Sequence, residues 1–336
     1  MVKQALRLDH LYHLTGAHGL YQHATGADPN PEFGYCLDDN VRALMMALRA
    51  HALTGKAEVL DYAERYLAFV EQAQRPDGRF RNFMDAQGAW LEEVGSDDSN
   101  GRAVWGLGFA ARYAPTAALR DRALRLLERS VPAIEAHAFP RAKGFSLIGL
   151  RNWVALGGGP TELARELADD LAKAFEASAS EDWQWFEPEL TYCNASLCDA
   201  LLGTEHQTIG LASLDWLCGL MDQEGVLSLI GNDGWYVRGG RRAVFDQQAV
   251  DAAAVSSACV EAYRATGEPR YRRWARMAYG WFTGENLTGE VMIDPQTGGC
   301  YDGLRPVGHN PNQGAESLLA WLSAHEDMLE LGWLDG

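Results

Sequence analysis

Acidic and amide side chains recur along this sequence, each time just before an apolar segment. The first group is Asp38–Asp39–Asn40 and the second is Asp97–Asp98–Ser99–Asn100. Three more follow: Glu187, Tyr192 and Asn194, then Asp246, Gln247 and Gln248, then Asn310, Asn312, Gln313 and Glu316. Carboxylates and amides accept or donate hydrogen bonds in fixed directions. A set of them around one cavity suits a ligand that carries many hydroxyl groups.

Pairs of carboxyl groups can also perform acid–base chemistry on such a ligand. Hydrolysis of a glycosidic bond needs one protonated and one ionised carboxyl group beside the bond. Burial or a like-charged neighbour raises the pKa of one of them. The adjacent pairs Asp38/Asp39 and Asp97/Asp98 would supply such a neighbour. The pattern therefore favours carbohydrate hydrolysis.

Each candidate residue has a predicted role. Glu187, beside Trp185 and Phe186, is predicted to be the general acid. The candidate bases that activate water are Asp39, Asp98 and Asp246. The side chains predicted to bind substrate are Asp38, Asn40, Arg42, Asp97, Trp185, Tyr192, Asn194, Gln247, Gln248, Asn312, Gln313 and Glu316.

Structural explanations compete with these roles. Aspartate and asparagine are ordinary helix N-caps. Arg42 and Arg102 each follow an aspartate by four residues, a spacing that favours an ion pair across one helical turn. Glu316 fits a buried salt bridge, and each aromatic residue fits core or loop packing.

Two kinds of helical segment alternate along the chain and would position these residues. Segments such as "VRALMMALRA" and "DAAAVSSACVEAY" are apolar or small nearly all round, which is typical of buried helices. Between them lie amphipathic segments with one polar face. The predicted pairs, buried type first, are 38–52 with 57–74, 98–113 with 117–136, 141–155 with 161–178, 190–203 with 206–222, and 247–266 with 269–283.

A sixth pair completes the pattern if the predicted helix 311–330 packs with the predicted N-terminal helix 3–14. Six inner helices ringed by six outer ones make an all-α (α/α)6 barrel, predicted as a single domain over residues 1–336. The links from outer to inner helices are mostly long, and long loops concentrate binding residues. The polar groups would therefore meet at one mouth of the barrel.

Composition narrows the class of protein. The 336 residues carry a formal net charge of −17, which argues against nucleic acid or an anionic membrane as partner. Residues 1–20 lack a signal-peptide pattern, so we expect a cytoplasmic protein. The six cysteines form no CxxC pair and are predicted to be free thiols. The sequence leaves the oligomeric state open.

Other functions remain open at this stage. Arg238, Arg241 and Arg242 could hold phosphate, as a glycoside phosphorylase requires. Sugar epimerisation would use histidines as acid and base, and only His309 and His325 come near the inner helices. The cluster of His10, His13, His18 and His23 fits no zinc spacing, so neither metal nor cofactor is predicted.

Five motifs resemble those of bacterial (α/α)6 proteins of the six-hairpin glycosidase type, described as glycosidase-like or glycosyltransferase-associated. They are "GYCLDDNVRAL", "DDSNGRAVWGLG", "WQWFEPELTYCNASL", "FDQQAVDAAA" and "NQGAESLLAW". The resemblance implies a carbohydrate-active protein acting on oligosaccharides at the barrel mouth. The family pattern often has Asp at Cys193 and His at Asn100, so a carbohydrate-binding protein without catalysis is a further alternative.

Overall fold

The computed structural model describes residues 6–334, and its contacts divide the chain into two compact units. The N-terminal unit comprises residues 13–23 and 29–169. Of the described residues, the C-terminal unit comprises 6–12, 24–28 and 170–334. Both units are built from helices joined by loops with two-residue strands, so the predicted all-α class is confirmed. The single domain stays a prediction.

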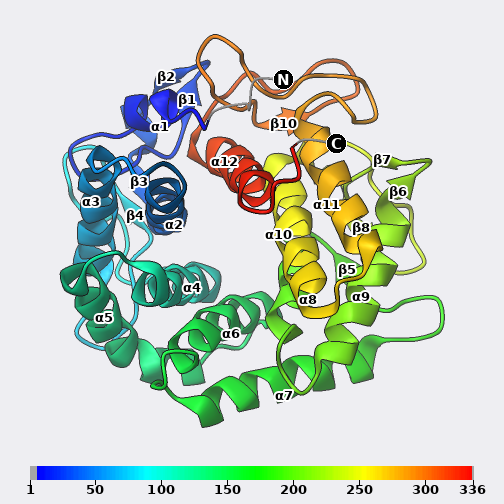
Figure 1. The fold of residues 1–336 in the computed structure, drawn as a ribbon, viewed down its shortest axis with the longest axis horizontal. Helices are drawn as coiled ribbons and strands as arrows, with labels where there is room; N and C mark the ends of the chain where they lie inside the picture. Colours follow the sequence, from blue (N-terminus) through cyan, green and yellow to red (C-terminus); the bar gives the residue numbers. More distant parts are fainter. Residues whose placement is uncertain (1–5, 335–336) are drawn as a thin grey trace. The chain divides into compact units, whose positions relative to one another are not determined.

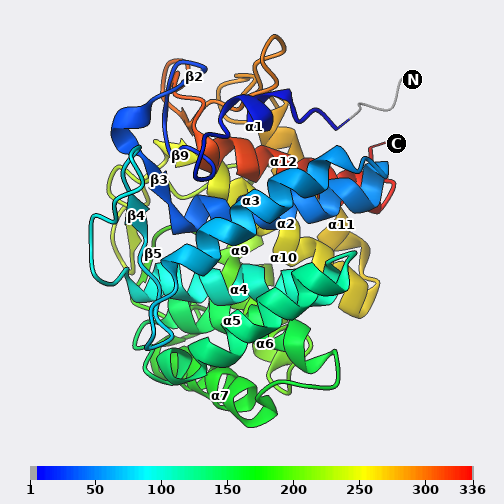
Figure 2. The same cartoon turned by 90° about the vertical axis from the view of Figure 1, so that its left-hand side faces the viewer.

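Five helices form the N-terminal unit, and a sixth begins in it. They are α2 (Leu37–Thr54), α3 (Glu58–Ala73), α4 (Asp97–Tyr113), α5 (Ala117–Glu135), α6 (Pro140–Val154) and α7 (Thr161–Ser178), which ends in the C-terminal unit. Helix α4 packs against α2, α5 and α6, while α3 packs against α2 (Figure 1). Strands β3 and β4 lie at the end where α2 begins (Figure 2).

Small residues let the buried helices α4 and α6 approach closely. A Cβ atom on Gly108 would lie 2.2 Å from the backbone oxygen of Gly149. One on Gly149 would lie 2.2 Å from the backbone oxygen of Val104. Because neither backbone can withdraw without separating the helices, both positions require glycine.

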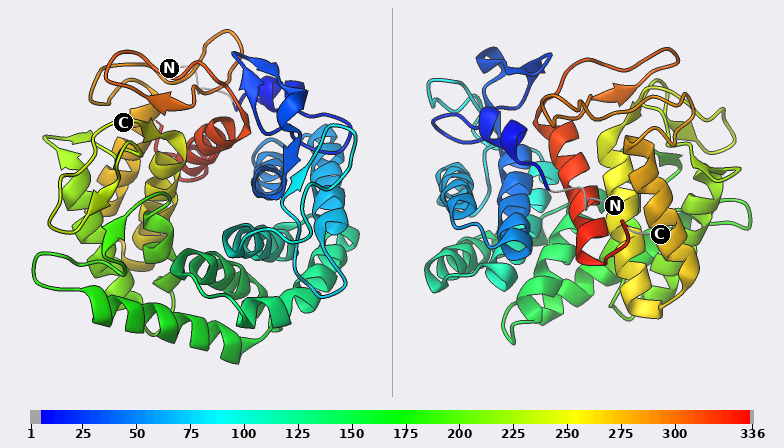
Figure 3. Two further views of the ribbon diagram at one scale, coloured as in Figure 1. Left: turned by 180° about the vertical axis from the view of Figure 1, so that it is seen from behind. Right: turned by 45° about the horizontal axis from the view of Figure 1, so that its top comes forward.

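The C-terminal unit repeats this arrangement. Its helices are α8 (Ala195–Leu201), α9 (Gln207–Met221), α10 (Ala249–Thr266), α11 (Pro269–Phe282) and α12 (Ala315–Glu330). Helix α10 packs against α8, α11 and α12, and α9 packs against α8. Figure 3 shows α10, α11 and α12 side by side. In each unit, three mostly buried helices thus contact one another in series: α2–α4–α6 and α8–α10–α12.

Short strand pairs, which the sequence analysis did not predict, tie the long loops together. Antiparallel pairs join β3 (Tyr35–Cys36) to β4 (Phe83–Met84), β5 (Glu189–Leu190) to β8 (Tyr236–Val237), β6 (Asp222–Gln223) to β7 (Val226–Leu227), and β9 (Gln247–Gln248) to β10 (Gly303–Leu304). Strands β1 (Ala24–Thr25) and β2 (Asp28–Pro29) and the 3₁₀ turn η1 (Pro31–Phe33) precede them. Strands β3, β5 and β9 each lie shortly before a buried helix, and so fix where that helix begins.

These strands explain the boundaries that were predicted wrongly. Helix α8 begins at Ala195 rather than 190 because β5 is extended and Cys193 has a φ of 47°. Helix α10 begins after β9, and α12 begins after Gly314 instead of at 311. The predicted N-terminal helix 3–14 shrinks to α1 (Asp9–His13), and its residues 3–5 lie outside the described part.

Two composition-based expectations can be compared with the structure. All six cysteines are buried free thiols, as predicted. Within residues 6–334, none of the helices combines the length and hydropathy that crossing a membrane demands.

Candidate functional site

The first turns of α2 and α4 present matching polar residues. Helix α2 begins Leu37–Asp38–Asp39–Asn40, and α4 begins Asp97–Asp98–Ser99–Asn100. Asp38 and Asp98 therefore both occupy the second helical position. Neither is the N-cap, because the cap residues are Cys36 and Ser96. Ordinary capping does not account for this pair of acids.

The two asparagines fasten each helix start to the loop before it. Asn40 Oδ1 accepts a hydrogen bond from Leu20 N at 2.8 Å, and its Nδ2 donates to Cys36 O at 2.8 Å. Asn100 Oδ1 accepts from Phe80 N at 2.7 Å, and its Nδ2 donates to Ser96 O at 2.8 Å. Both side chains are buried and committed to backbone groups, which is a structural role.

Arg42 and Arg102 form ion pairs with aspartates at different spacings. Arg102 Nε donates to Asp98 Oδ2 at 2.9 Å, the four-residue ion pair that the spacing predicts. Arg42 instead donates through NH2 to Asp39 Oδ1 at 2.7 Å, three residues away. Asp39 also accepts a bond from the Cys36 thiol at 3.0 Å and is 2% exposed. The predicted base Asp39 is thus held in a buried ion pair.

Asp38, the first aspartate of α2, has a raised pKa. Burial raises the pKa of Asp38 from 3.8 to about 6, opposed by Arg102 and reinforced by the Asp98 carboxylate. Its Oδ1 atom is shielded from solvent and has no hydrogen-bond partner among the described residues; the same is true of Asp98 Oδ1. One helix start therefore offers an acid that holds its proton near pH 6, and the neighbouring one offers an ion-paired carboxylate.

Asp97 forms a hydrogen bond with a neighbouring loop. Its Oδ2 accepts a hydrogen bond from Ala138 N at 3.0 Å, in the link between α5 and α6. This bond gives Asp97 a role in joining two segments of the N-terminal unit.

In the C-terminal unit, Glu187 and Asp246 lie on loops that strand pairing ties together. Glu187 precedes β5, and its backbone oxygen accepts a bond from Trp183 Nε1 at 2.8 Å. Asp246 precedes β9; its side chain is 45% exposed and lies 3.7 Å from Arg305 Nε. Both remain predicted catalytic residues, and both are half-buried.

The amides predicted to bind substrate in this unit contact the protein itself. Asn194 exchanges hydrogen bonds with the backbone of Thr191. Gln247 accepts from Trp281 Nε1 and donates to Val244 O, while Gln313 accepts from Thr297 Oγ1 and donates to Asp294 Oδ2. Asn312 Oδ1 accepts from Ala24 N at 3.0 Å. These bonds set loop geometry.

The remaining predicted binders differ in exposure. Trp185 is fully buried and stacks on Trp216, so its ring offers no free face to a sugar. Tyr192, Gln248 and Glu316 are half-buried and retain exposed surface.

Two of the three arginines considered for phosphate bind groups of the protein itself, and Arg238 NH2 also lies 3.7 Å from Asp182 Oδ1. Arg242 donates to Leu220 O and Ser228 Oγ, both at 2.7 Å. Arg238 donates to Ser178 O at 3.0 Å and to the hydroxyl of Ser180. Their guanidinium groups hold loops in place, which weakens the argument for a phosphate site here.

The sequence analysis missed one histidine–carboxylate pair. His309 Nδ1 lies 2.7 Å from Glu290 Oε1, and the His309 ring stacks on Tyr301 with centroids 3.6 Å apart. Both side chains of the pair are partly exposed, at 24% for His309 and 33% for Glu290. By contrast, His325 is buried and contacts the Tyr279 hydroxyl at 3.2 Å. Glu290 is 19 residues from His309, so no local motif reveals the pair.

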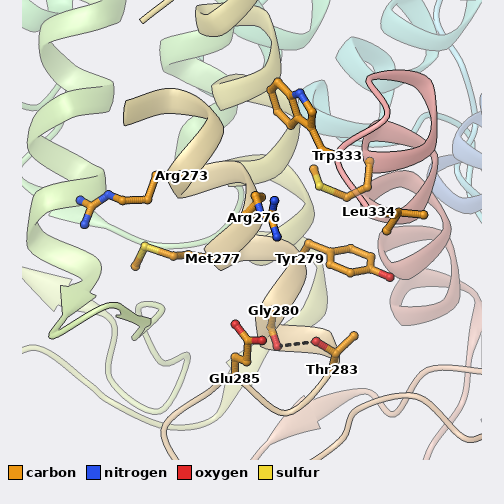
Figure 4. A pocket seen from close by; sticks show the side chains of 10 residues that line it. Arg273, Arg276, Met277, Tyr279, Gly280, Thr283, Glu285, Trp333 and Leu334 are labelled. Atoms are coloured by element: carbon orange, nitrogen blue, oxygen red, sulfur yellow. Dashed lines mark hydrogen bonds between the residues drawn. The ribbon is translucent and has the colours of Figure 1, made fainter. Parts of the chain in front are cut away.

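A pocket of about 360 Å³ lies elsewhere in the C-terminal unit (Figure 4). Its walls come from α11 and its C-terminal turn, from Met328 of α12, and from Trp333 and Leu334. None of the predicted site residues lines it.

Comparison with known proteins gives structural likeness only. Neither a scan against family models nor a search of curated proteins matches this chain. Among solved structures, a sugar epimerase from a ruminal bacterium has a TM-score of 0.73 and 14% identity, covering 99% of both chains. A D-mannose isomerase has a TM-score of 0.72 and 17% identity, covering 96% of this chain and 95% of its own.

A GH76 α-mannanase from Bacteroides thetaiotaomicron is also similar, with a TM-score of 0.66 and 10% identity over 96% of this chain and 94% of its own. At these identities the likeness shows the fold alone. That fold is an all-α (α/α)6 barrel, so the predicted fold class is confirmed.

Proposed function

We propose that this chain is a carbohydrate-processing enzyme that hydrolyses a glycosidic bond, with Asp38 as general acid and Asp98 as its partner carboxylate. The observation that carries this proposal is the matching placement of Asp38 and Asp98 in the first turns of α2 and α4, where Arg102 binds Asp98 and burial raises the pKa of Asp38 to about 6. Glycoside hydrolysis requires one protonated and one ionised carboxyl group. The starts of α2 and α4 supply this combination.

Asp38 would donate its proton to the oxygen of the departing sugar. Below about pH 6 its carboxyl group is protonated, which matches the need of a general acid. Asp98 is held by Arg102 through Oδ2 and its side chain is 22% exposed, so this carboxylate would accept a proton from the attacking water. The acid assignment thereby moves from Glu187 to Asp38, while Glu187 and Asp246 stay candidates for substrate contact.

The similar structures support the substrate class. They include a sugar epimerase, a D-mannose isomerase and an α-mannanase, all of which act on sugars. Fold likeness of this kind is an analogy and does not choose among those reactions. The choice of hydrolysis comes from the carboxyl pair.

Sugar epimerisation or isomerisation is the second candidate, and the Glu290–His309 pair favours it. A histidine oriented by a carboxylate through Nδ1 presents Nε2 as a proton acceptor or donor, here partly exposed. No histidine occupies the first turn of α2, α4, α6, α8, α10 or α12 within residues 6–334. We rank this reaction second because it would depend on this one loop histidine.

One set of incubations separates these reactions. The protein is mixed with manno- and gluco-oligosaccharides in D₂O, with and without phosphate, and the products are analysed by mass spectrometry and NMR. Hydrolysis gives shorter sugars without carbon-bound deuterium, whereas epimerisation or isomerisation by proton exchange introduces it. Sugar 1-phosphate formed only with phosphate would indicate phosphorolysis, and binding without turnover a non-catalytic protein.

The pH profile and one variant then test the acid. We expect the hydrolysis rate to fall as pH rises through about 6, because Asp38 loses its proton there. Asp38→Asn should remove most activity, while Glu187→Gln serves as the matched variant. Full activity in Asp38→Asn together with loss in Glu187→Gln would return the acid role to Glu187.

A further inference from the structure

Two half-exposed aromatic side chains meet where two loops of the C-terminal unit join. Tyr192 lies between β5 and α8, and Trp235 lies directly before β8. Their ring centroids are 6.4 Å apart and the rings are tilted by 50°. Both residues keep part of their surface exposed. The nearby Trp183 and Trp185 are 2% and 0% exposed, so packing explains those two rings but leaves Tyr192 and Trp235 unexplained.

The backbone beneath this pair adopts an unfavourable conformation. Trp235 has a φ of 54°, and Cys193, next to Tyr192, has a φ of 47°. Bulky residues rarely enter this left-handed region, and such strain concentrates at functional sites. Glycine, which tolerates this conformation, stands beside Trp235 at position 234 but not at 235 itself. The chain thus retains an indole where its backbone favours glycine.

Specific hydrogen bonds hold the strained backbone in place. Trp235 N donates to Gly231 O at 3.1 Å, and Trp235 O accepts from Ala243 N at 2.8 Å. Cys193 N donates to the buried carboxylate of Asp251 at 2.6 Å. The pairing of β5 with β8, with Leu190 opposite Tyr236, joins the two loops. The backbone that carries the aromatic pair is therefore held in place before any ligand arrives.

We propose that Tyr192 and Trp235 form an aromatic subsite that binds one pyranose ring of an oligosaccharide; the choice of ligand rests on the proposed carbohydrate-processing function. A rigid, half-exposed aromatic surface suits the apolar face of a sugar ring, and the tyrosine hydroxyl can bond a sugar hydroxyl. Asp233 and Glu189, both exposed, offer further acceptors on the same loops. These acids favour an uncharged, hydroxyl-rich ligand over an anionic one.

Binding is measured on the full chain by saturation-transfer NMR with manno- and gluco-oligosaccharides of two to five sugars. Trp235→Ala and Tyr192→Ala are each expected to weaken binding by roughly tenfold or more, and Trp235→Phe by less. Tyr113→Ala is the control, because Tyr113 is 50% exposed on α4 and belongs to no proposed site. Trp235→Gly should lose binding as Trp235→Ala does, yet melt at a higher temperature, because glycine relieves the strain at φ 54°.

The outcomes separate this subsite from the proposed reaction. Weakened binding in the two alanine variants supports the subsite even if no sugar is hydrolysed, in which case only the proposed reaction fails. Sugars bound or cleaved equally well by wild type and both variants would overturn the subsite and leave the reaction standing. Absence of any sugar binding to wild type, or preferential binding of adenosine used as a flat competitor, would also overturn it.

Discussion

The starts of α2 and α4 share a pattern but distribute their charges differently. Both place aspartate at the second helical position, asparagine two residues later and arginine four residues later. At the position between the aspartate and the asparagine, α2 has Asp39 and α4 has Ser99. Asp39 attracts Arg42, so Asp38 lacks the direct ion pair that Asp98 makes with Arg102. In the proposed mechanism, this single position would therefore decide which aspartate is the acid and which is the carboxylate.

The largest expected effect is on the hydrolysis rate. Substrates with different leaving groups would distinguish the roles of Asp38 and Asp98. Asp38→Asn and Asp98→Asn should each lower kcat for oligosaccharides by about 10²- to 10⁴-fold, the usual contribution of an acid or base. An aryl glycoside whose phenolate leaves without protonation should restore much of the rate of Asp38→Asn but not of Asp98→Asn. Steady-state kinetics with both substrate types measure this.

Equal rescue of both variants, or of neither, would contradict this division of roles. Asp121→Asn is the matched control, because Asp121 is exposed on α5 and belongs to no proposed site. It should retain most of the wild-type rate.

The second expected effect concerns stability. It tests whether Asn40 and Asn100 hold the starts of α2 and α4 equally strongly. Asn40→Ala and Asn100→Ala should each destabilise the protein by about 3 kcal/mol, because each leaves buried backbone groups without partners. Urea unfolding measures both values. Asn152→Ala, which removes an amide from a half-buried site on α6, should cost less than about 1 kcal/mol. A small cost at only one of Asn40 and Asn100 would show that the two starts are held differently.

The third effect concerns stability and pH at Asp38. Its folded pKa of about 6 lies above the unfolded value near 3.8, so the folded state binds the proton more tightly. The stability that this gives below about pH 4 is lost as pH rises through 6. Asp38→Asn carries no charge and should exceed wild type by about 2 kcal/mol at pH 8, with little difference at pH 4.

Thermal or urea unfolding of wild type and Asp38→Asn across this pH range measures the difference. The same substitution at Asp98 breaks the ion pair with Arg102 and should not stabilise the protein at pH 8. A stability difference at Asp38 that does not change with pH would mean that its carboxyl group is not protonated on folding.

The helix order could be predicted from sequence because it depends on local periodicity. The alternation of nearly all-apolar segments with amphipathic ones predicted the boundaries of α2 to α7 to within a few residues. Two-residue strands escaped prediction because their pairing joins distant loops, as β9 at 247–248 pairs with β10 at 303–304. These pairings also moved the starts of α8 and α10.

The polar groups could be located from sequence, but their roles could not be assigned. Spacing favours a four-residue ion pair for both Arg42 and Arg102, and only the side-chain conformations show that Arg42 turns to Asp39. Burial of particular atoms, as at Asp38 Oδ1, is likewise a property of packing. Sequence reasoning therefore placed Asp38 among the binders and Asp39 among the bases.

The smallest expected effect comes from a substitution that gives the start of α2 the residue order of α4. Asp39→Ser gives α2 the same Asp–Ser–Asn order as α4 and frees Arg42 to pair with Asp38. It also removes a carboxylate that raises the pKa of Asp38. Both changes favour the ionised form of Asp38, so the alkaline limb of the pH–rate profile should move down by about one pH unit. The maximal rate should change little, since Asp39 touches no reacting group in the proposed mechanism.

Ser99→Asp is the reciprocal variant and should draw Arg102 away from Asp98, because it recreates the three-residue pair seen in α2. An unmoved alkaline limb in Asp39→Ser would mean that Arg42 does not change partner. A rate loss of a hundredfold or more would instead make Asp39 a catalytic base, as its position in the sequence first suggested. The substitutions at positions 39 and 99 therefore test which carboxyl group is the acid. They also test whether the choice of arginine partner determines its pKa.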